Sequence, residues 1–113
     1  MNRENRPWGS YSVLESQDTF QVKELRIDPG KRLSLQSHKL RAEHWFIISG
    51  RGTVEIDVRQ FSVSPGESID IPMGVKHRIS CDPEAPLIFI EVQTGKSFEE
   101  SDIVRFEDDY GRS

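Results

Sequence analysis

Turn-forming residues recur at short intervals along this chain of 113 residues, and their spacing limits how it can fold. The turn signals are RPWGS at 6–10, DPG at 28–30, SGRG at 49–52, SPG at 64–66, PMG at 72–74 and DPEAP at 82–86. Proline and glycine favour the backbone angles that tight turns need. No segment has a sustained apolar period of 3.6 residues, so we expect no long helix. The pattern is typical of an all-β sandwich or barrel.

Short β-rich runs lie between these turns. We expect strands at 20–27, 33–38, 45–48, 53–58, 61–63, 68–71, 76–80 and 87–93. The turn at 49–52 predicts a hairpin between the third and fourth of these strands. The acidic end, SFEESDIVRFEDDYGRS, is expected to form either a short helix or an arm packed on the barrel. The length fits a single domain spanning 1–113.

Charge and composition exclude several classes of function. The formal net charge is −4 and the pI is near 5.4, so no global basic field attracts nucleic acid. The single cysteine, Cys81, excludes an intramolecular disulfide. The first ten residues lack the apolar core of a signal peptide, and no run is long enough to span a membrane. We therefore expect a cytoplasmic protein that binds neither nucleic acid nor membrane.

Four polar residues form a candidate metal site. Gln36 and His38 are two positions apart, so on a strand both side chains leave the same face. Glu43 follows five residues after His38, and His77 comes from a second turn-flanked segment that begins at Gly66. Imidazole nitrogens together with carboxylate and amide oxygens suit a divalent first-row metal. We therefore expect these residues to converge, although a metal-free barrel remains the alternative.

The spacing of these residues resembles the two motifs of the cupin superfamily. The first runs from Gly30 through Gln36, His38 and Glu43 to Gly50, and the second from Gly66 to His77. The resemblance implies a double-stranded β-helix, or jelly-roll barrel, in which the four residues point inward to one metal ion. Zn²⁺ is the first expectation, with Mn, Co, Ni or Fe as alternatives. Most cupins have histidine at the position of Gln36.

A narrower resemblance covers nearly the whole chain. RPWGSY (6–11), LSLQSHKLRAEHWFIISG (33–50), IPMGVKHRI (71–79), IEVQTG (90–95) and DIVRFEDDYGR (102–112) are similar to the type II phosphomannose isomerase family. That domain commonly forms the C-terminal half of bifunctional mannose-1-phosphate guanylyltransferase/mannose-6-phosphate isomerases, and glutamine is usual there at the position of Gln36. This chain departs at Lys39 and Leu40, where the family often has histidine. It also lacks a Gly-rich nucleotide loop, so we expect no guanylyl transfer.

The family resemblance implies a metal-dependent isomerase that interconverts mannose 6-phosphate and fructose 6-phosphate. Such a reaction moves a proton between C1 and C2 of the sugar, so it needs a base. His44 and Glu91 are the two candidates. Strict alternation from Glu43 would send His44 outward, whereas Glu91 lies in the apolar run LIFIEVQ, where an inward carboxylate is costly without a task.

Arginines are the candidates for holding the sugar phosphate, because the guanidinium group offers a planar fork to phosphate oxygens. We expect Arg41, Arg78 or Arg105 in this role. Trp8 and Trp45 are expected in the core or in an interface rather than as sugar-stacking platforms.

Two other functions are also compatible with the sequence. The chain could be a non-catalytic metal-binding cupin that binds a sugar phosphate or sugar nucleotide, or a partner of a separate guanylyltransferase. Small cupins frequently pair, so the resemblance also implies a homodimer.

Overall fold

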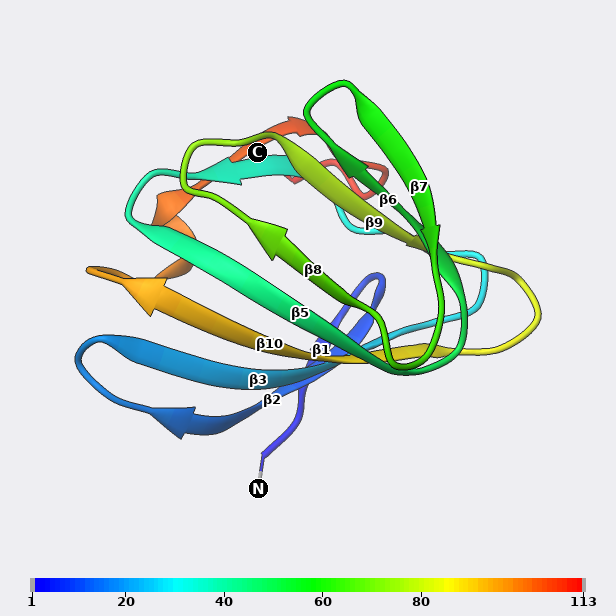
Figure 1. The fold of residues 1–113 in the computed structure, drawn as a ribbon, viewed down its shortest axis with the longest axis horizontal. Coiled ribbons are helices and arrows are strands. Elements are labelled where there is room, and N and C mark those ends of the chain that lie inside the picture. Colours follow the sequence, from blue (N-terminus) through cyan, green and yellow to red (C-terminus); the bar gives the residue numbers. More distant parts are fainter. Residues whose placement is uncertain (1, 113) are drawn as a thin grey trace.

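The protein folds into two antiparallel sheets that face each other, as described for residues 2–112 of a computed structural model (Figure 1). The six-stranded sheet has the order β1 (Glu4–Arg6), β2 (Gly9–Ser16), β3 (Phe20–Ile27), β10 (Leu87–Gly95), β5 (Arg41–Ser49) and β8 (Ser68–Ile71). The five-stranded sheet has the order β11 (Ile103–Glu107), β4 (Leu35–His38), β9 (His77–Cys81), β6 (Gly52–Ile56) and β7 (Arg59–Val63). This is the all-β barrel that the turn spacing predicts.

The expected strands are present, and those at 20–27 and 68–71 have the predicted bounds. The hairpin predicted at 49–52 is wrong. β5 already pairs with β10 on one edge and β8 on the other, so β6 has no free edge there and joins the opposite sheet. Gly50 makes this crossing at φ 82°, and a Cβ added to it would lie 2.2 Å from the carbonyl oxygen of Pro86. The connection is therefore a close sheet-to-sheet turn.

The core fills the space between the two sheets, where every second residue of each central strand points inward. Trp8 and Trp45 are both buried in it, as expected from the sequence. The other buried apolar residues are Leu25, Ile27, Leu33, Ile47, Val54, Ile56, Val63, Ile69, Ile71, Ile79, Cys81, Leu87 and Phe89. This apolar packing fixes the inward faces of β5, β9 and β10, which also carry polar residues.

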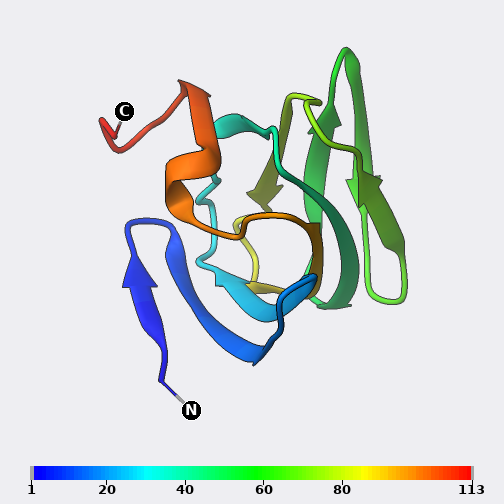
Figure 2. The same cartoon turned by 90° about the vertical axis from the view of Figure 1, so that its left-hand side faces the viewer.

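The acidic C-terminal segment combines both structures that the sequence left open. It forms one 3₁₀ turn, η1 (Glu100–Asp102), followed by β11, which pairs with β4 at the edge of the five-stranded sheet. Figure 2 shows this segment and the β1–β2 hairpin on the same side of the barrel. Segments near the two ends of the described chain therefore lie on the same side of the barrel. None of the helical structure between residues 2 and 112 has the length and apolar character needed to cross a membrane.

Candidate metal centre

Three residues meet between the two sheets. His38 ends β4 and His77 begins β9 in the five-stranded sheet, whereas Glu43 lies on β5 of the six-stranded sheet. Nε2 of His38 is 3.3 Å from Glu43 Oε2, and Nε2 of His77 is 3.9 Å from Glu43 Oε1. One ligand atom from each residue can be chosen so that all lie within 4.8 Å of one another. Both predicted motifs cross between the sheets, which is why their ligands converge inside the barrel.

The protonation state of this cluster suits a metal ion. Burial lowers the pKa of His38 to about 4 and also lowers the pKa of His77, so both imidazoles are neutral at neutral pH. Burial alone would raise the pKa of Glu43, but the two imidazoles and Arg41 hold it at about 2, so its carboxylate is ionised. Neutral imidazole and ionised carboxylate are the forms that bind divalent metals.

The orientation of the histidines also suits a metal ion. Nδ1 of His77 lies 2.9 Å from the carbonyl oxygen of Val75, and donation to it would leave the Nε2 lone pair facing Glu43. Within residues 2–112, the buried Nε2 atoms of His38 and His77 have no hydrogen-bond partner. Buried polar atoms without partners are costly. A cation between them and Glu43 would satisfy both.

Gln36 lies beside this cluster. In the register of the five-stranded sheet it is opposite His77 on β9 and opposite Arg105 on β11, so the three side chains share the inner face. Its Oε1 accepts a hydrogen bond from the hydroxyl of Ser34 at 2.9 Å. Gln36 is therefore placed where a fourth donor could act, and its ligand role stays a prediction.

A second buried carboxylate adjoins the cluster. Glu91 on β10 is opposite Trp45 on β5, and its Oε2 accepts a hydrogen bond of 3.1 Å from the Trp45 indole. Its Oε1 accepts one of 2.6 Å from the amide of Gln93. Burial, followed by the charge of Glu43, raises the pKa of Glu91 to about 8. Glu91 can therefore gain and lose a proton near neutral pH.

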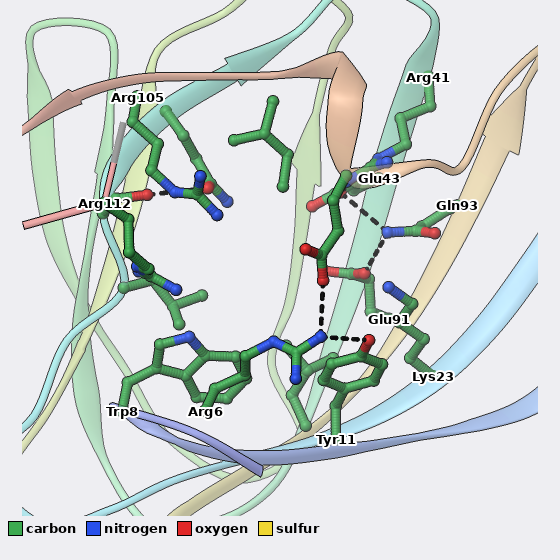
Figure 3. Close-up of a pocket in the computed structure, with 16 residues that line it drawn as sticks. Arg6, Trp8, Tyr11, Lys23, Arg41, Glu43, Glu91, Gln93, Arg105 and Arg112 are labelled. Atoms are coloured by element: carbon green, nitrogen blue, oxygen red, sulfur yellow. Dashed lines mark hydrogen bonds and ion pairs between the residues drawn. The ribbon is translucent and has the colours of Figure 1, made fainter. Parts of the chain in front are cut away.

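A cavity of about 70 Å³ opens next to these acids (Figure 3). Its wall includes the carboxylates of Glu43, Glu91 and Glu100, together with five basic side chains and several uncharged residues. The basic side chains are Arg6, Lys23, Arg41, Arg105 and Arg112. The cavity thus combines a carboxyl group of raised pKa, the edge of the candidate metal cluster and an excess of cations.

The structure brings some of the predicted residues to this cavity and not others. Arg41 lines it and donates from Nε to Glu43 Oε2 at 3.2 Å, and Arg105 lines it as well. His44 points to the outer face of β5, where its side chain is 46% exposed and its Nδ1 lies 2.6 Å from Asp70. Arg78 is buried and donates to the Leu33 carbonyl and to Glu107, so it holds β11 in place.

Sequence reasoning missed three of the basic residues, Arg6, Lys23 and Arg112. A signal existed for Lys23, because positions 23, 25 and 27 share one face of a strand and the last two are buried Leu25 and Ile27. Arg6 and Arg112 lie in the turn-like segments RPWGS and DDYGRS, at opposite ends of the chain. Only the folded barrel brings them together.

The two facing sheets and the inward cluster of two histidines and a glutamate define a cupin. Solved structures with this fold include the following two. The capsular polysaccharide assembling protein CapF from Staphylococcus aureus has a TM-score of 0.81 and 22% identity, over 94% of this chain and 34% of that one. The Cnp3 cupin domain of Schizosaccharomyces pombe has a TM-score of 0.78 and 12% identity, over 84% and 69%.

Within this class the chain belongs to the mannose-6-phosphate isomerase C-terminal family, whose model matches residues 2–108. It is 45% identical to the xanthan biosynthesis protein XanB of Xanthomonas campestris pv. campestris, over 96% of this chain and 23% of that protein. It is 43% identical to the mannose-1-phosphate guanylyltransferase ManC of Salmonella typhimurium, over 99% and 24%. The chain therefore spans about a quarter of the length of these relatives.

Proposed function

We propose that this chain is a metal-dependent aldose–ketose isomerase that interconverts mannose 6-phosphate and fructose 6-phosphate. The observation that carries the proposal is the position of Glu91, which lies against the metal cluster, lines the cavity and has a pKa of about 8. A buried carboxyl group with a raised pKa, placed in a cavity beside a metal cluster, has the properties that a proton-transfer group needs. Membership of the mannose-6-phosphate isomerase C-terminal family supports the choice of substrate.

The reaction requires one proton to move between neighbouring carbons. The ionised carboxylate of Glu91 would take the proton from C2 of open-chain mannose 6-phosphate, which leaves an enediol, and would return a proton to C1. A second proton passes between the oxygens at C1 and C2, so the atoms balance. The hydrogen bonds from Trp45 and Gln93 would hold the carboxylate of Glu91 in one orientation during both steps.

The residues present fit a divalent metal ion, with Zn²⁺ as the first expectation from the nitrogen and oxygen donors. His38, Glu43 and His77 would hold it, with Gln36 as the proposed fourth donor. When bound, the ion would supply Lewis-acid polarisation of the sugar oxygens at C1 and C2. Arg41 bonds to Glu43 and so would keep this ligand in place from the cavity side.

The test is a coupled assay of mannose 6-phosphate conversion with protein loaded separately with Zn²⁺, Mn²⁺, Co²⁺ and Ni²⁺. We expect turnover with at least one metal and none after chelation. Stoichiometric metal binding without turnover under any of these conditions would exclude the isomerase.

A second function is a non-catalytic cupin that binds a sugar phosphate or sugar nucleotide, acting alone or as a partner of a separate guanylyltransferase. The replacement of two family histidines by Lys39 and Leu40 favours it, as does the name of the relative ManC. Binding of mannose 6-phosphate without conversion would support this function. Co-purification with a guanylyltransferase would support the partner role.

A further inference from the structure

We propose that the carboxylate of Glu100 occupies the position of a ligand phosphate, and that Arg6 and Arg105 form the phosphate subsite of the cavity. That this phosphate belongs to a sugar phosphate rests on the proposed function. The subsite itself rests on the charged groups that line the cavity.

Arg6 and Glu100 form an ion pair across the cavity wall. Nη2 of Arg6 donates to Glu100 Oε1 at 2.8 Å and to the hydroxyl of Tyr11 at 3.1 Å. The guanidinium also lies over the ring of Tyr11, 5.1 Å from its centroid. These contacts hold the guanidinium of Arg6 in a fixed direction, with an anion bound to one of its nitrogens. A carboxylate and a phosphate present similar oxygens to such a fork.

Other cations surround the same position. The pKa of Glu100 is lowered first by its hydrogen bond to Arg6, and the charges of Lys23 and Arg105 lower it further. Figure 3 shows the side chains of Arg105 and Arg112 reaching into the cavity from the side opposite Glu91 and Gln93. Glu100 thus lies among several cations, with Glu4 3.9 Å from Arg6 as a second carboxylate on this guanidinium. The five basic side chains of the cavity wall outnumber its three carboxylates, which leaves capacity for a group of greater negative charge.

The distribution of charge along the cavity matches a sugar 6-phosphate. One wall carries Glu91 and Glu43, where the chemistry at C1 and C2 is proposed. The opposite wall carries Arg105 and Arg112, with Arg6 between the two walls, whereas Lys23 and Arg41 lie on the same side as Glu91 (Figure 3). The phosphate of a hexose 6-phosphate is on the carbon most distant from C1. A substrate lying across the cavity would therefore have C1 and C2 beside Glu91 and Glu43, and its phosphate beside Arg6 and Arg105.

Displacement of Glu100 requires little rearrangement. Its side chain is 56% exposed and lies in η1, a 3₁₀ turn of three residues. Exposed ion pairs contribute little to stability, so the carboxylate can move into solvent when a phosphate takes its place. Glu100 would then act as a competitor for the subsite in the empty protein.

The test is calorimetric titration of the full, Zn²⁺-loaded chain with inorganic phosphate and with mannose 6-phosphate. We expect Glu100→Gln to bind both about three- to tenfold more tightly, because the competing charge is gone. Arg6→Gln is expected to weaken both by about tenfold or more, the loss typical of a hydrogen bond to a charged group. Arg6→Lys, which keeps the charge without the fork, should fall between wild type and Arg6→Gln.

The matched control is Arg3→Gln. Arg3 forms a 2.8 Å ion pair with Glu24, equal in length to that of Arg6 with Glu100, but it does not line the cavity. The phosphate affinity of Arg3→Gln should equal that of wild type. The melting temperature of each variant shows whether that variant is folded. Unchanged phosphate affinity in folded Arg6→Gln and Glu100→Gln would overturn the proposal and leave the metal as the phosphate-binding group. If the phosphate affinities of the variants rank as expected but no variant and no wild-type protein turns over mannose 6-phosphate, the subsite is supported. Only the proposed isomerase activity would then be contradicted.

Discussion

Glu43 and Glu91 are two buried carboxylates that share the same two hydrogen-bond donors. The Trp45 indole donates to both at 3.1 Å, and the Gln93 amide donates to Glu43 at 3.2 Å and to Glu91 at 2.6 Å. Their environments separate their pKa values, since cations and imidazoles lower that of Glu43 whereas burial and the neighbouring charge raise that of Glu91. One is therefore suited to bind metal and the other to carry a proton.

This separation predicts the effect of removing each candidate base. Glu91→Gln keeps the shape of the side chain but cannot take up the proton, so we expect kcat to fall about 10²–10⁴-fold with bound metal unchanged. His44→Gln should retain wild-type kcat, because its side chain lies on the outer face of β5. Steady-state kinetics with metal analysis of each preparation makes the comparison. Loss of kcat in His44→Gln alone would assign the base to His44 instead.

The three histidines of the chain provide a matched test of the metal centre. His38→Ala and His77→Ala each remove a ligand, so elemental analysis should find little bound metal, whereas His44→Ala should bind one equivalent. Metal should also stabilise the wild-type protein against unfolding, by about 2.7 kcal/mol at a free concentration of 100 times Kd. Thermal melts with and without chelator measure this. Full metal content in the His77 variant would remove His77 from the ligand set.

The sequence predicted the parts of this protein that depend on local spacing. The strand at 20–27 follows from turn residues and alternation, and the convergence of His38, Glu43 and His77 was expected from motif resemblance. The direction of Glu91 was left open by the sequence, and the structure places it inward. The cation set of the cavity could not be predicted in this way. Arg6 and Glu100 are 94 residues apart, and only the pairing of both chain ends with the barrel edges brings them to 2.8 Å.

The same limit explains the wrong hairpin at 49–52. Two strands joined by a short glycine turn usually pair, but β5 has both edges occupied by strands distant in the sequence. Similarly, Arg78 follows His77 directly and yet serves the attachment of β11, because adjacent residues of a strand point to opposite faces.

The buried histidines predict a pH dependence for the metal-free protein. The pKa of His38 is about 4 in the folded state, below its ordinary value, so its neutral form stabilises the fold above pH 6.5 and this stability is lost as the pH falls toward 4. The loss from His38 is about 2–3 kcal/mol. Glu91 acts in the opposite direction, because its raised pKa stabilises the fold at low pH and that stability is lost as the pH rises toward 8.

The contribution of His38 is therefore measured as a difference. Urea unfolding of metal-free wild type and His38→Gln at pH 7 and pH 4.5 should show a larger drop in the free energy of unfolding for wild type. Equal drops in the free energy of unfolding of the two proteins would mean that His38 is already protonated in the folded state at pH 4.5, so that its pKa is not lowered by folding.

The turn at Gly50 predicts a large effect of a small substitution. Gly50 and Gly66 both have positive φ angles, 82° and 89°, which alanine adopts with strain of about 1 kcal/mol. A Cβ at Gly50 would also lie 2.2 Å from the carbonyl oxygen of Pro86, whereas at Gly66 nothing lies within 4 Å. Gly50→Ala should therefore lower the free energy of unfolding by about 3 kcal/mol or more, and Gly66→Ala by about 1. Similar losses in both variants would show that Pro86 moves away at little cost.

The outer face of the six-stranded sheet predicts a homodimer. Its centre is apolar, with Phe46 and Ile48 exposed on β5 beside half-buried residues of β10. Light scattering should give the mass of a dimer for wild type and of a monomer for Phe46→Glu. Val58→Glu is the control, because Val58 is 93% exposed in the turn between β6 and β7 and should leave the dimer intact. A monomeric wild type would contradict the prediction, and so would a dimer that persists in Phe46→Glu.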